Sequence, residues 1–253
     1  MLKIRNAAIG EGKPKICVPL VSGDFEELEK ECTSLEGVPL DMLEWRVDYL
    51  MNRDGFSATA DLDRAYRIIR SHFPDTPLLT TVRTKGQGGV HDMAEAAYFS
   101  TLSLLLSSRW ADLLDVEYGH DSMDTKILMA KAREKKIPLL MSFHSFHRAL
   151  TEEEITNTLE AMASFHPDIL KIAVMPETPA DVAALLSAAA KRMTRFPETP
   201  VMTIAMGPMG VLTRAAGNYM GGPITFAAGK EASAPGQLTA NEMRQVLDVL
   251  YNG

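Results

Sequence analysis

The feature that most constrains the fold is an alternation of short apolar segments with amphipathic segments along the chain. A typical strand segment is DILKIAVMP (168–176), where a continuous apolar run next to proline favours a parallel strand buried on both faces. A typical helical segment is 58–73, whose apolar residues recur at the spacing of one helix face. Strands that alternate with helices predict βαβ units and a parallel sheet.

Eight such strand–helix units can be counted. The expected strands are residues 15–21, 41–49, 77–83, 111–118, 137–144, 168–176, 200–206 and 223–228. Eight units in 253 residues predict a (β/α)8 TIM barrel, a fold that commonly takes ~250 residues as one domain. An open doubly wound sheet usually has a glycine-rich turn after its first strand, which VSGDFEE (21–27) lacks. We predict a single TIM-barrel domain over 1–253, with 1–14 as an N-terminal extension that packs on the barrel.

Charge and apolar patterning exclude several classes of partner. The net charge of −7 and a pI near 5.4 argue against nucleic acid. No apolar run approaches the ~18 residues that a membrane span needs, and the first residues lack the apolar core of a signal peptide. Cys17 and Cys32 form neither a disulfide framework nor a CxxC pair. We therefore expect a cytoplasmic, reduced protein with no membrane partner.

Polar residues cluster near the ends of the expected strands, where TIM barrels carry their active sites. Charged side chains are almost never fully buried without partners, so a shared polar pocket is the simplest explanation for all of them. The strand residues are Glu44, Arg46, Arg83, Asp115, Glu117, His144 and Lys171, and the loops after the last two strands add Arg214, Ser233 and Gln237.

Lys171 is the unusual residue of the sixth expected strand. It shares a strand face with Ile169 and Ala173, so its ammonium group is expected to lose water. Free lysine titrates at ~10.4, whereas at a pKa of ~7–8 about half of it would be neutral near neutral pH. A neutral amine can attack a ketone and form a Schiff base. The alternative is a lysine whose ammonium group reaches solvent at the strand end.

The other candidates have structural alternatives. Glu44 and Arg46 could form an ion pair that braces the barrel, and we favour Asp115 and Glu117 as partners of the arginines. His144 could be a structural histidine, but a strand end that faces a lysine favours a base.

Arg83 and Arg214 could each pair with an acid, or they could hold an anionic substrate and keep the amine neutral. His144 and His147 straddle a strand end without an HExxH motif or a cysteine cluster, so we expect no metal ion. We also expect no other cofactor, and the absence of GxSxG argues against a Ser-His-Asp triad.

Six motifs in register resemble type I 3-dehydroquinate dehydratases over essentially the whole chain. They are LEWRVD on the second strand, an arginine and a Gly-Gly loop after the third, histidine closing the fifth, KIAVMP on the sixth, GVLTRAAG after the seventh and ASAPGQ after the eighth. The resemblance implies dehydration of 3-dehydroquinate to 3-dehydroshikimate, a step of the shikimate pathway and thus of aromatic amino acid biosynthesis. It also implies a homodimer that acts on a small molecule.

The resemblance further implies a role for each residue. Lys171 would form the Schiff base, His144 would act as general acid and base, and Arg214 would bind the substrate carboxylate. The residues that would bind hydroxyls or order the pocket are Glu44, Arg46, Arg83, Ser233 and Gln237, the last two on a loop that closes over substrate in the family.

One residue departs from the family pattern. The family usually has a glutamate before the Gly-Gly pair, hydrogen-bonded to the histidine, and this chain has Gln87 there. Glutamine can keep the hydrogen bond but cannot stabilise an imidazolium by charge. Two alternatives stay open: another Schiff-base barrel such as a class I aldolase and, because of Gln87, a weakly active barrel that binds a pathway metabolite.

Overall fold

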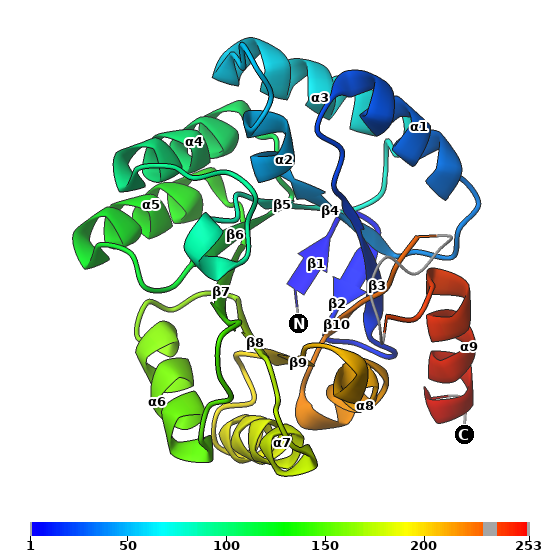
Figure 1. Ribbon diagram of the computed structural model, residues 1–253, viewed down its shortest axis with the longest axis vertical. Coiled ribbons are helices and arrows are strands. Elements are labelled where there is room, and N and C mark those ends of the chain that lie inside the picture. The colour runs from blue at the N-terminus through cyan, green and yellow to red at the C-terminus, as the bar shows by residue number, and fades with distance from the viewer. Residues whose placement is uncertain (1, 230–236, 252–253) are drawn as a thin grey trace.

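The computed structural model describes residues 2–229 and 237–251, and within them the strands form a barrel (Figure 1). The barrel strands are β3 (Lys15–Leu20), β4 (Met42–Arg46), β5 (Leu78–Thr81), β6 (Leu113–Glu117), β7 (Leu139–Ser145), β8 (Ile169–Val174), β9 (Val201–Ala205) and β10 (Ile224–Phe226). They form one sheet in the order β10-β3-β4-β5-β6-β7-β8-β9, and each neighbouring pair is parallel. The predicted (β/α)8 TIM barrel is confirmed.

The helices surround the ring of strands on its outside (Figure 1). The helices that follow successive barrel strands are α1 (Phe25–Leu35), α3 (Ala58–His72), α4 (Glu95–Ser108), α5 (Ser122–Lys135), α6 (Glu152–Ala163), α7 (Pro179–Arg195), α8 (Val211–Ala216) and α9 (Ala240–Tyr251). Shorter pieces are α2 (Val47–Met51) and the 3₁₀ turns η1 (Lys85–Gln87), η2 (Pro208–Gly210) and η3 (Gly217–Met220). Within the described ranges, none of the helices has the length and apolar character that crossing a membrane requires.

Seven of the eight expected strands end one to three residues earlier than the sequence indicates, and two of these differences involve candidate site residues. The second was expected to reach residue 49, but β4 ends at Arg46 and the chain turns into α2. The third was expected to include Arg83, but β5 ends at Thr81. A short apolar run such as VDYL can be buried as a strand or as a helical turn, so periodicity alone does not separate the two.

Alternation along each strand separates two apolar cores. On β8 the side chains of Leu170, Ile172 and Val174 face the helices, whereas Ile169 faces the barrel interior. The interior layer nearest the N-terminal ends of the strands is apolar and buried: Met42, Leu79, Leu113, Leu140, Ile169, Met202 and Ile224.

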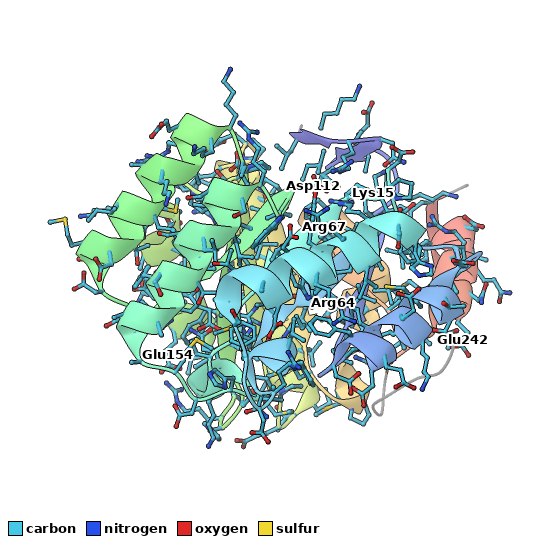
Figure 2. All side chains as sticks on the ribbon, turned by 90° about the horizontal axis from the view of Figure 1, so that it is seen from above. Lys15, Arg64, Arg67, Asp112, Glu154 and Glu242 are labelled. Carbon is cyan, nitrogen blue, oxygen red and sulfur yellow. The ribbon has the colours of Figure 1, made fainter. Side chains whose placement is uncertain are left out.

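An N-terminal hairpin covers one end of the barrel. Strands β1 (Leu2–Ile4) and β2 (Ala7–Ile9) pair antiparallel, and Ile4, Ala7 and Ile9 pack against the apolar interior layer. Figure 2 shows the hairpin at the end that holds Lys15 and Asp112, where strands begin. The opposite end, where strands finish, is left for polar side chains.

His72 joins α3 to the end of α1 on the outer surface. Its Nδ1 lies 2.6 Å from Glu36 Oε1, and its Nε2 lies 2.9 Å from Glu29 Oε1. The hydrogen bond to Glu36, followed by that to Glu29, raises the pKa of His72 above its ordinary value. A raised pKa in the folded state means that these contacts stabilise the fold fully below the unfolded pKa, and that this stabilisation is lost as pH rises through the folded pKa.

We expect His72→Ala to lower the Tm by about 1–4 °C at pH 6 and by less at pH 9, because the exposed charge pairs are worth little once the imidazole is neutral. Thermal unfolding followed by circular dichroism at both pH values measures the difference. An equal deficit at pH 6 and pH 9 would show that packing, and not the charge of His72, carries the effect.

Candidate active site

The barrel interior is polar near the C-terminal ends of the strands. The same strand face that is apolar near the strand starts carries charged or hydroxyl groups two and four residues later. These residues are Glu44 and Arg46 on β4, Thr81 on β5, Asp115 and Glu117 on β6, Ser142 and His144 on β7, and Lys171 on β8.

Lys171 is enclosed within this polar layer and is 4% exposed, so its ammonium group does not reach bulk solvent. Its Nζ lies 3.9 Å from Glu44 Oε1, beyond hydrogen-bond distance, and 4.3 Å from the centre of the Phe226 ring. Burial lowers the pKa of Lys171 below its ordinary value, and the positive charge of Arg83 acts in the same direction while Glu44 opposes both. Burial therefore shifts the equilibrium of Lys171 toward the neutral amine.

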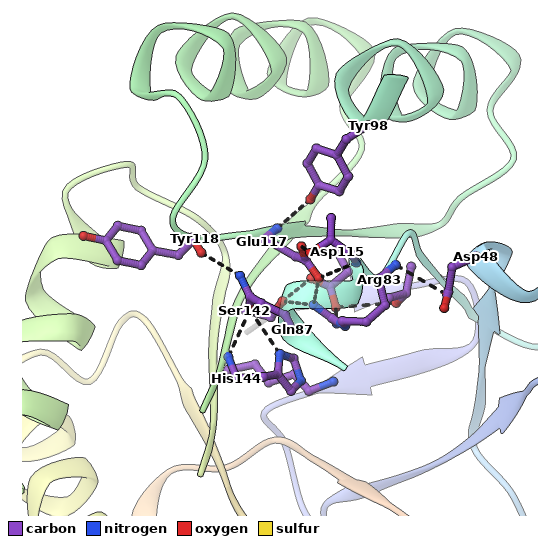
Figure 3. A network of polar contacts seen from close by, with 12 residues as sticks. Asp48, Arg83, Gln87, Tyr98, Asp115, Glu117, Tyr118, Ser142 and His144 are labelled. Carbon is purple, nitrogen blue, oxygen red and sulfur yellow. Dashed lines mark hydrogen bonds and ion pairs between the residues drawn. The ribbon is translucent and has the colours of Figure 1, made fainter. Parts of the chain in front are cut away.

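Arg83 is held by two buried carboxylates and a hydroxyl (Figure 3). Its Nη1 donates to Glu117 Oε1 and to Ser142 Oγ, each at 2.8 Å, and its Nη2 donates to Asp115. Burial alone would lower the pKa of Arg83, but Asp115 and Glu117 outweigh it and raise the pKa. The interpretation of these two acids as partners of an arginine is confirmed.

Arg46 pairs with Asp48 rather than with Glu44. Its Nε and Nη2 donate to the two carboxylate oxygens of Asp48 at 2.8 and 2.7 Å, a bidentate arrangement. Glu44 instead accepts from Thr81 Oγ1 at 2.9 Å and faces Lys171. The suggested Glu44–Arg46 brace is therefore wrong, since the chain turns into α2 after Arg46 and brings Asp48 within reach.

His144 is in contact with Gln87 from the loop after β5 (Figure 3). The backbone N–H of His144 donates to Gln87 Oε1 at 3.0 Å, and His144 Nδ1 lies 3.4 Å from the same oxygen. Gln87 Nε2 donates to the Tyr118 carbonyl at 2.8 Å, so both ends of the amide are engaged. Burial, followed by the charges of Arg83 and Lys171, holds the pKa of His144 well below its ordinary value. The imidazole is neutral near neutral pH.

Two glycines let this loop approach the site. Gly88 has φ +88°, and a Cβ there would meet the Phe146 ring at 2.3 Å. A Cβ on Gly89 would lie 1.9 Å from the Arg83 carbonyl oxygen. The Phe146 ring stacks beside His144 with 6.2 Å between ring centres and 14° between planes. The Gly-Gly pair therefore brings Gln87 and Phe146 together around the histidine.

Arg214 differs from the other cations. Its side chain is buried in α8, and its guanidinium forms no ion pair or hydrogen bond with any residue in the described ranges. Burial without a counter-charge lowers the pKa of Arg214 below its ordinary value. A buried cation without a protein partner is costly, and an anionic ligand would remove that cost.

The candidate residues in the described part of the chain meet around a pocket of about 430 Å³. It is lined by Glu44, Arg46, Arg83, Gln87, His144, Lys171, Arg214 and Gln237, with apolar walls that include Phe146, Met206 and Phe226. Ser233 lies outside the described residues. A cavity of about 410 Å³ at the hairpin end, beside Leu2 and Pro200, contains none of these candidates.

Three polar residues of the site were not singled out from the sequence: Asp48, Thr81 and Ser142. Each falls at the inward-facing position of an expected strand, so strict alternation along the strands would have indicated them. Their partners would have remained unknown, because Arg46, Glu44 and Arg83 each have several acids or hydroxyls at similar heights.

The pocket combines a desolvated amine, an imidazole whose pKa is lowered, and a guanidinium that has no partner in the described part of the chain. Such a set can hold a small anion, attack its carbonyl and transfer protons. Among the described residues, no group of three or more His, Cys, Asp or Glu side chains is arranged to hold a metal ion.

Comparison with known proteins identifies the family of this chain. Residues 16–253 match the family model described as type I 3-dehydroquinase. A 3-dehydroquinate dehydratase of Bacillus licheniformis is 35% identical over 99% of this chain and 98% of its own length. One of Listeria monocytogenes is 37% identical over 98% of this chain and 97% of its own. The crystal structure of a Clostridium difficile type I 3-dehydroquinate dehydratase with covalently modified comenic acid is similar with a TM-score of 0.93, 33% identity and coverage of 99% and 97% of the two chains.

We expect Gln87→Glu to raise the pKa of His144 by at least about half a unit, because a carboxylate beside the ring favours imidazolium. The chemical shift of the His144 ring protons, followed by NMR between pH 4 and pH 9, measures it. The carboxylate cannot donate to the Tyr118 carbonyl, so a small loss of Tm should accompany the change. Superimposable titration curves would show that residue 87 does not influence the charge of His144.

Proposed function

The chain belongs to the type I 3-dehydroquinase family and is a hydro-lyase, and on that premise we propose that it dehydrates 3-dehydroquinate to 3-dehydroshikimate through an imine on Lys171. The observation that carries the proposal is the position of Lys171. Its amine is desolvated, faces the pocket and has no hydrogen-bonded acid among the described residues.

Lys171 acts as the nucleophile. The neutral amine adds to the ring ketone, and loss of water gives the imine. The imine nitrogen takes a proton from solvent, which the later hydrolysis returns, and the protonated imine withdraws electrons from the adjacent carbon. The lowered pKa of Lys171 supports this role, since a larger share of the side chain is nucleophilic at neutral pH.

His144 transfers the protons. It removes a proton from the carbon next to the imine, then returns a proton to the departing hydroxyl, so one water leaves. Hydrolysis of the imine releases the enone and restores the amine. The neutral state of His144 supports the first step, and its Nδ1 contact with Gln87 leaves Nε2 free for the substrate.

The remaining residues bind the substrate. Arg214 takes the carboxylate, because it is the buried cation whose guanidinium has no partner among the described residues. Three residues on β4 or just after β5 present polar atoms that bind the hydroxyl groups of the substrate: Glu44, Arg46 and Arg83. Gln237, which also lines the pocket, contributes from the loop before α9.

Of the two alternative functions that the sequence left open, one is excluded by the family and the other is decided by an assay. A class I aldolase does not fit the family to which the chain belongs. A barrel that binds the substrate without turnover remains an outcome of the assay. Incubation with 3-dehydroquinate should produce the ultraviolet absorbance of the conjugated enone, and its absence from folded protein would contradict the proposed function.

We expect borohydride added during turnover to inactivate the enzyme irreversibly, because it reduces the imine to a stable secondary amine. Mass spectrometry of the digested protein should find the added mass on the peptide that contains Lys171. Exposed Lys85, on the loop that carries Gln87, is the internal control and should stay unlabelled. Labelling at another lysine would refute the nucleophile assignment, and Lys171→Ala should show neither label nor dehydration.

We expect Arg214→Ala to raise KM by about 10–100-fold with a smaller effect on kcat, since a charge-assisted hydrogen bond to a desolvated carboxylate is worth ~1.5–3 kcal/mol. Steady-state kinetics by the enone assay measure both constants. Arg214→Lys keeps the charge without the planar fork, and its KM should fall between the other two. A KM equal to that of the wild type would remove Arg214 from the carboxylate role.

A further inference from the structure

His120 lies behind the pocket, in the loop after β6, with both ring nitrogens against carboxylates. Its Nε2 is 3.2 Å from Glu117 Oε2, and its Nδ1 is 3.2 Å from Glu95 Oε1. The ring stacks on Tyr98 with 4.3 Å between centres and 22° between planes, and the side chain is 17% exposed. The imidazole is thus held in one place by two acids and an aromatic ring.

Glu117 connects His120 to the pocket. Its Oε1 accepts from Arg83 Nη1 at 2.8 Å and from the Thr84 backbone N–H at 3.0 Å. Its Oε2 accepts from Thr84 Oγ1 at 2.6 Å and faces His120. Figure 3 also shows Tyr98, whose hydroxyl accepts from the backbone N–H of Glu117 on β6 at 2.8 Å. Each carboxylate oxygen of Glu117 therefore has two contacts, and His120 is one of the two contacts of Oε2.

Thr84 links Glu117 to the loop beside His144. The Thr84 carbonyl accepts from the N–H of Gln87 at 3.0 Å and from the N–H of Gly89 at 2.9 Å. Gln87 in turn accepts from the backbone of His144. A rotation of the Glu117 carboxylate would move both the Arg83 guanidinium and the start of this loop.

We propose that His120 is a positioning residue for dehydration: through Glu117 it holds Arg83 in the pocket and Gln87 against His144. The inference rests on the proposed function, because the reaction defines what must be positioned. His120 itself is not among the residues that line the pocket, so its effect on the reaction would be indirect.

The charge state of His120 fits this role. An imidazolium donates from both ring nitrogens, whereas neutral imidazole donates from one, and two acceptors face this ring. Burial would lower the pKa of His120, but hydrogen bonds and charge from Glu117 and Glu95 outweigh it and raise the pKa. Two further charged groups belong to the same contacts: Arg83, which binds Glu117 Oε1, and Asp121, whose carboxylate caps the start of α5.

His120→Ala, with His72→Ala as the matched control, tests the inference. Both histidines join two carboxylates, but His72 lies between α1 and α3 and does not line the pocket. We expect His120→Ala to lower kcat about tenfold and to change KM less, because Gln87 no longer holds His144 in place. His72→Ala should stay within about twofold of the wild type despite its lower Tm. His120→Gln, whose amide can still donate to Glu117, should recover most of the lost rate.

NMR titration of His144 gives a readout that needs no turnover. Arg83 lowers the pKa of His144, so release of Arg83 in His120→Ala should raise it and leave His72→Ala unchanged. If His120→Ala does not fold, His120→Asn replaces it, because its shorter amide does not reach Glu117. In an active wild type, a kcat of the folded variant within twofold of wild type overturns the inference. If the wild type itself produces no enone, the proposed function fails, and an unchanged His144 titration then overturns this inference separately.

Discussion

The ion pairs of Arg83 with Asp115 and Glu117 are the interaction on which the rest of the site depends. Removing charges from water costs several kcal/mol per ion unless they are paired and hydrogen-bonded, and here Ser142 supplies a further contact. Both acids are bound by Arg83, and neither forms an ion pair with Lys171, although the charge of Asp115 opposes the lowering of the Lys171 pKa. The lysine is left with Glu44 at 3.9 Å, a positive neighbour and little water, and these together favour its neutral form.

The partners of the pocket arginines also distinguish Arg214 from the other two. Arg46 has Asp48 and Arg83 has two acids, but Arg214 has neither an acid nor a hydrogen-bond acceptor for its guanidinium among the described residues. An unpaired buried cation is a cost to stability that a bound carboxylate offsets. The pocket therefore separates its cations into those that the protein satisfies and one that is suited to a ligand, which is the arrangement expected for binding an anionic substrate.

Gln87 affects the charge state of His144. The amide keeps two hydrogen bonds, one from the His144 backbone and one to the Tyr118 carbonyl, so the loop geometry does not need a carboxylate. What the amide omits is negative charge, while Arg83 and Lys171 both disfavour imidazolium. The histidine is thus suited to accept a proton, and in the proposed mechanism its acid form arises from the proton that it takes from the substrate.

The barrel and the inward-facing residues could be predicted from the sequence, because alternation within a strand decides which face a side chain occupies. Glu44, Lys171 and His144 follow from that rule, as do Asp115 and Glu117 as partners of an arginine. The bidentate pair of Arg46 with Asp48, and the contact of His120 with Glu117 from outside the barrel, could not be predicted. Long side chains choose among acids by distance in three dimensions, and those distances depend on where β4 ends and how the loops after β5 and β6 fold. The sequence by itself determined the fold and which side chains enter the barrel, whereas the tertiary structure decided which charges are neutralised, since pairing depends on distances of a few ångströms between distant segments.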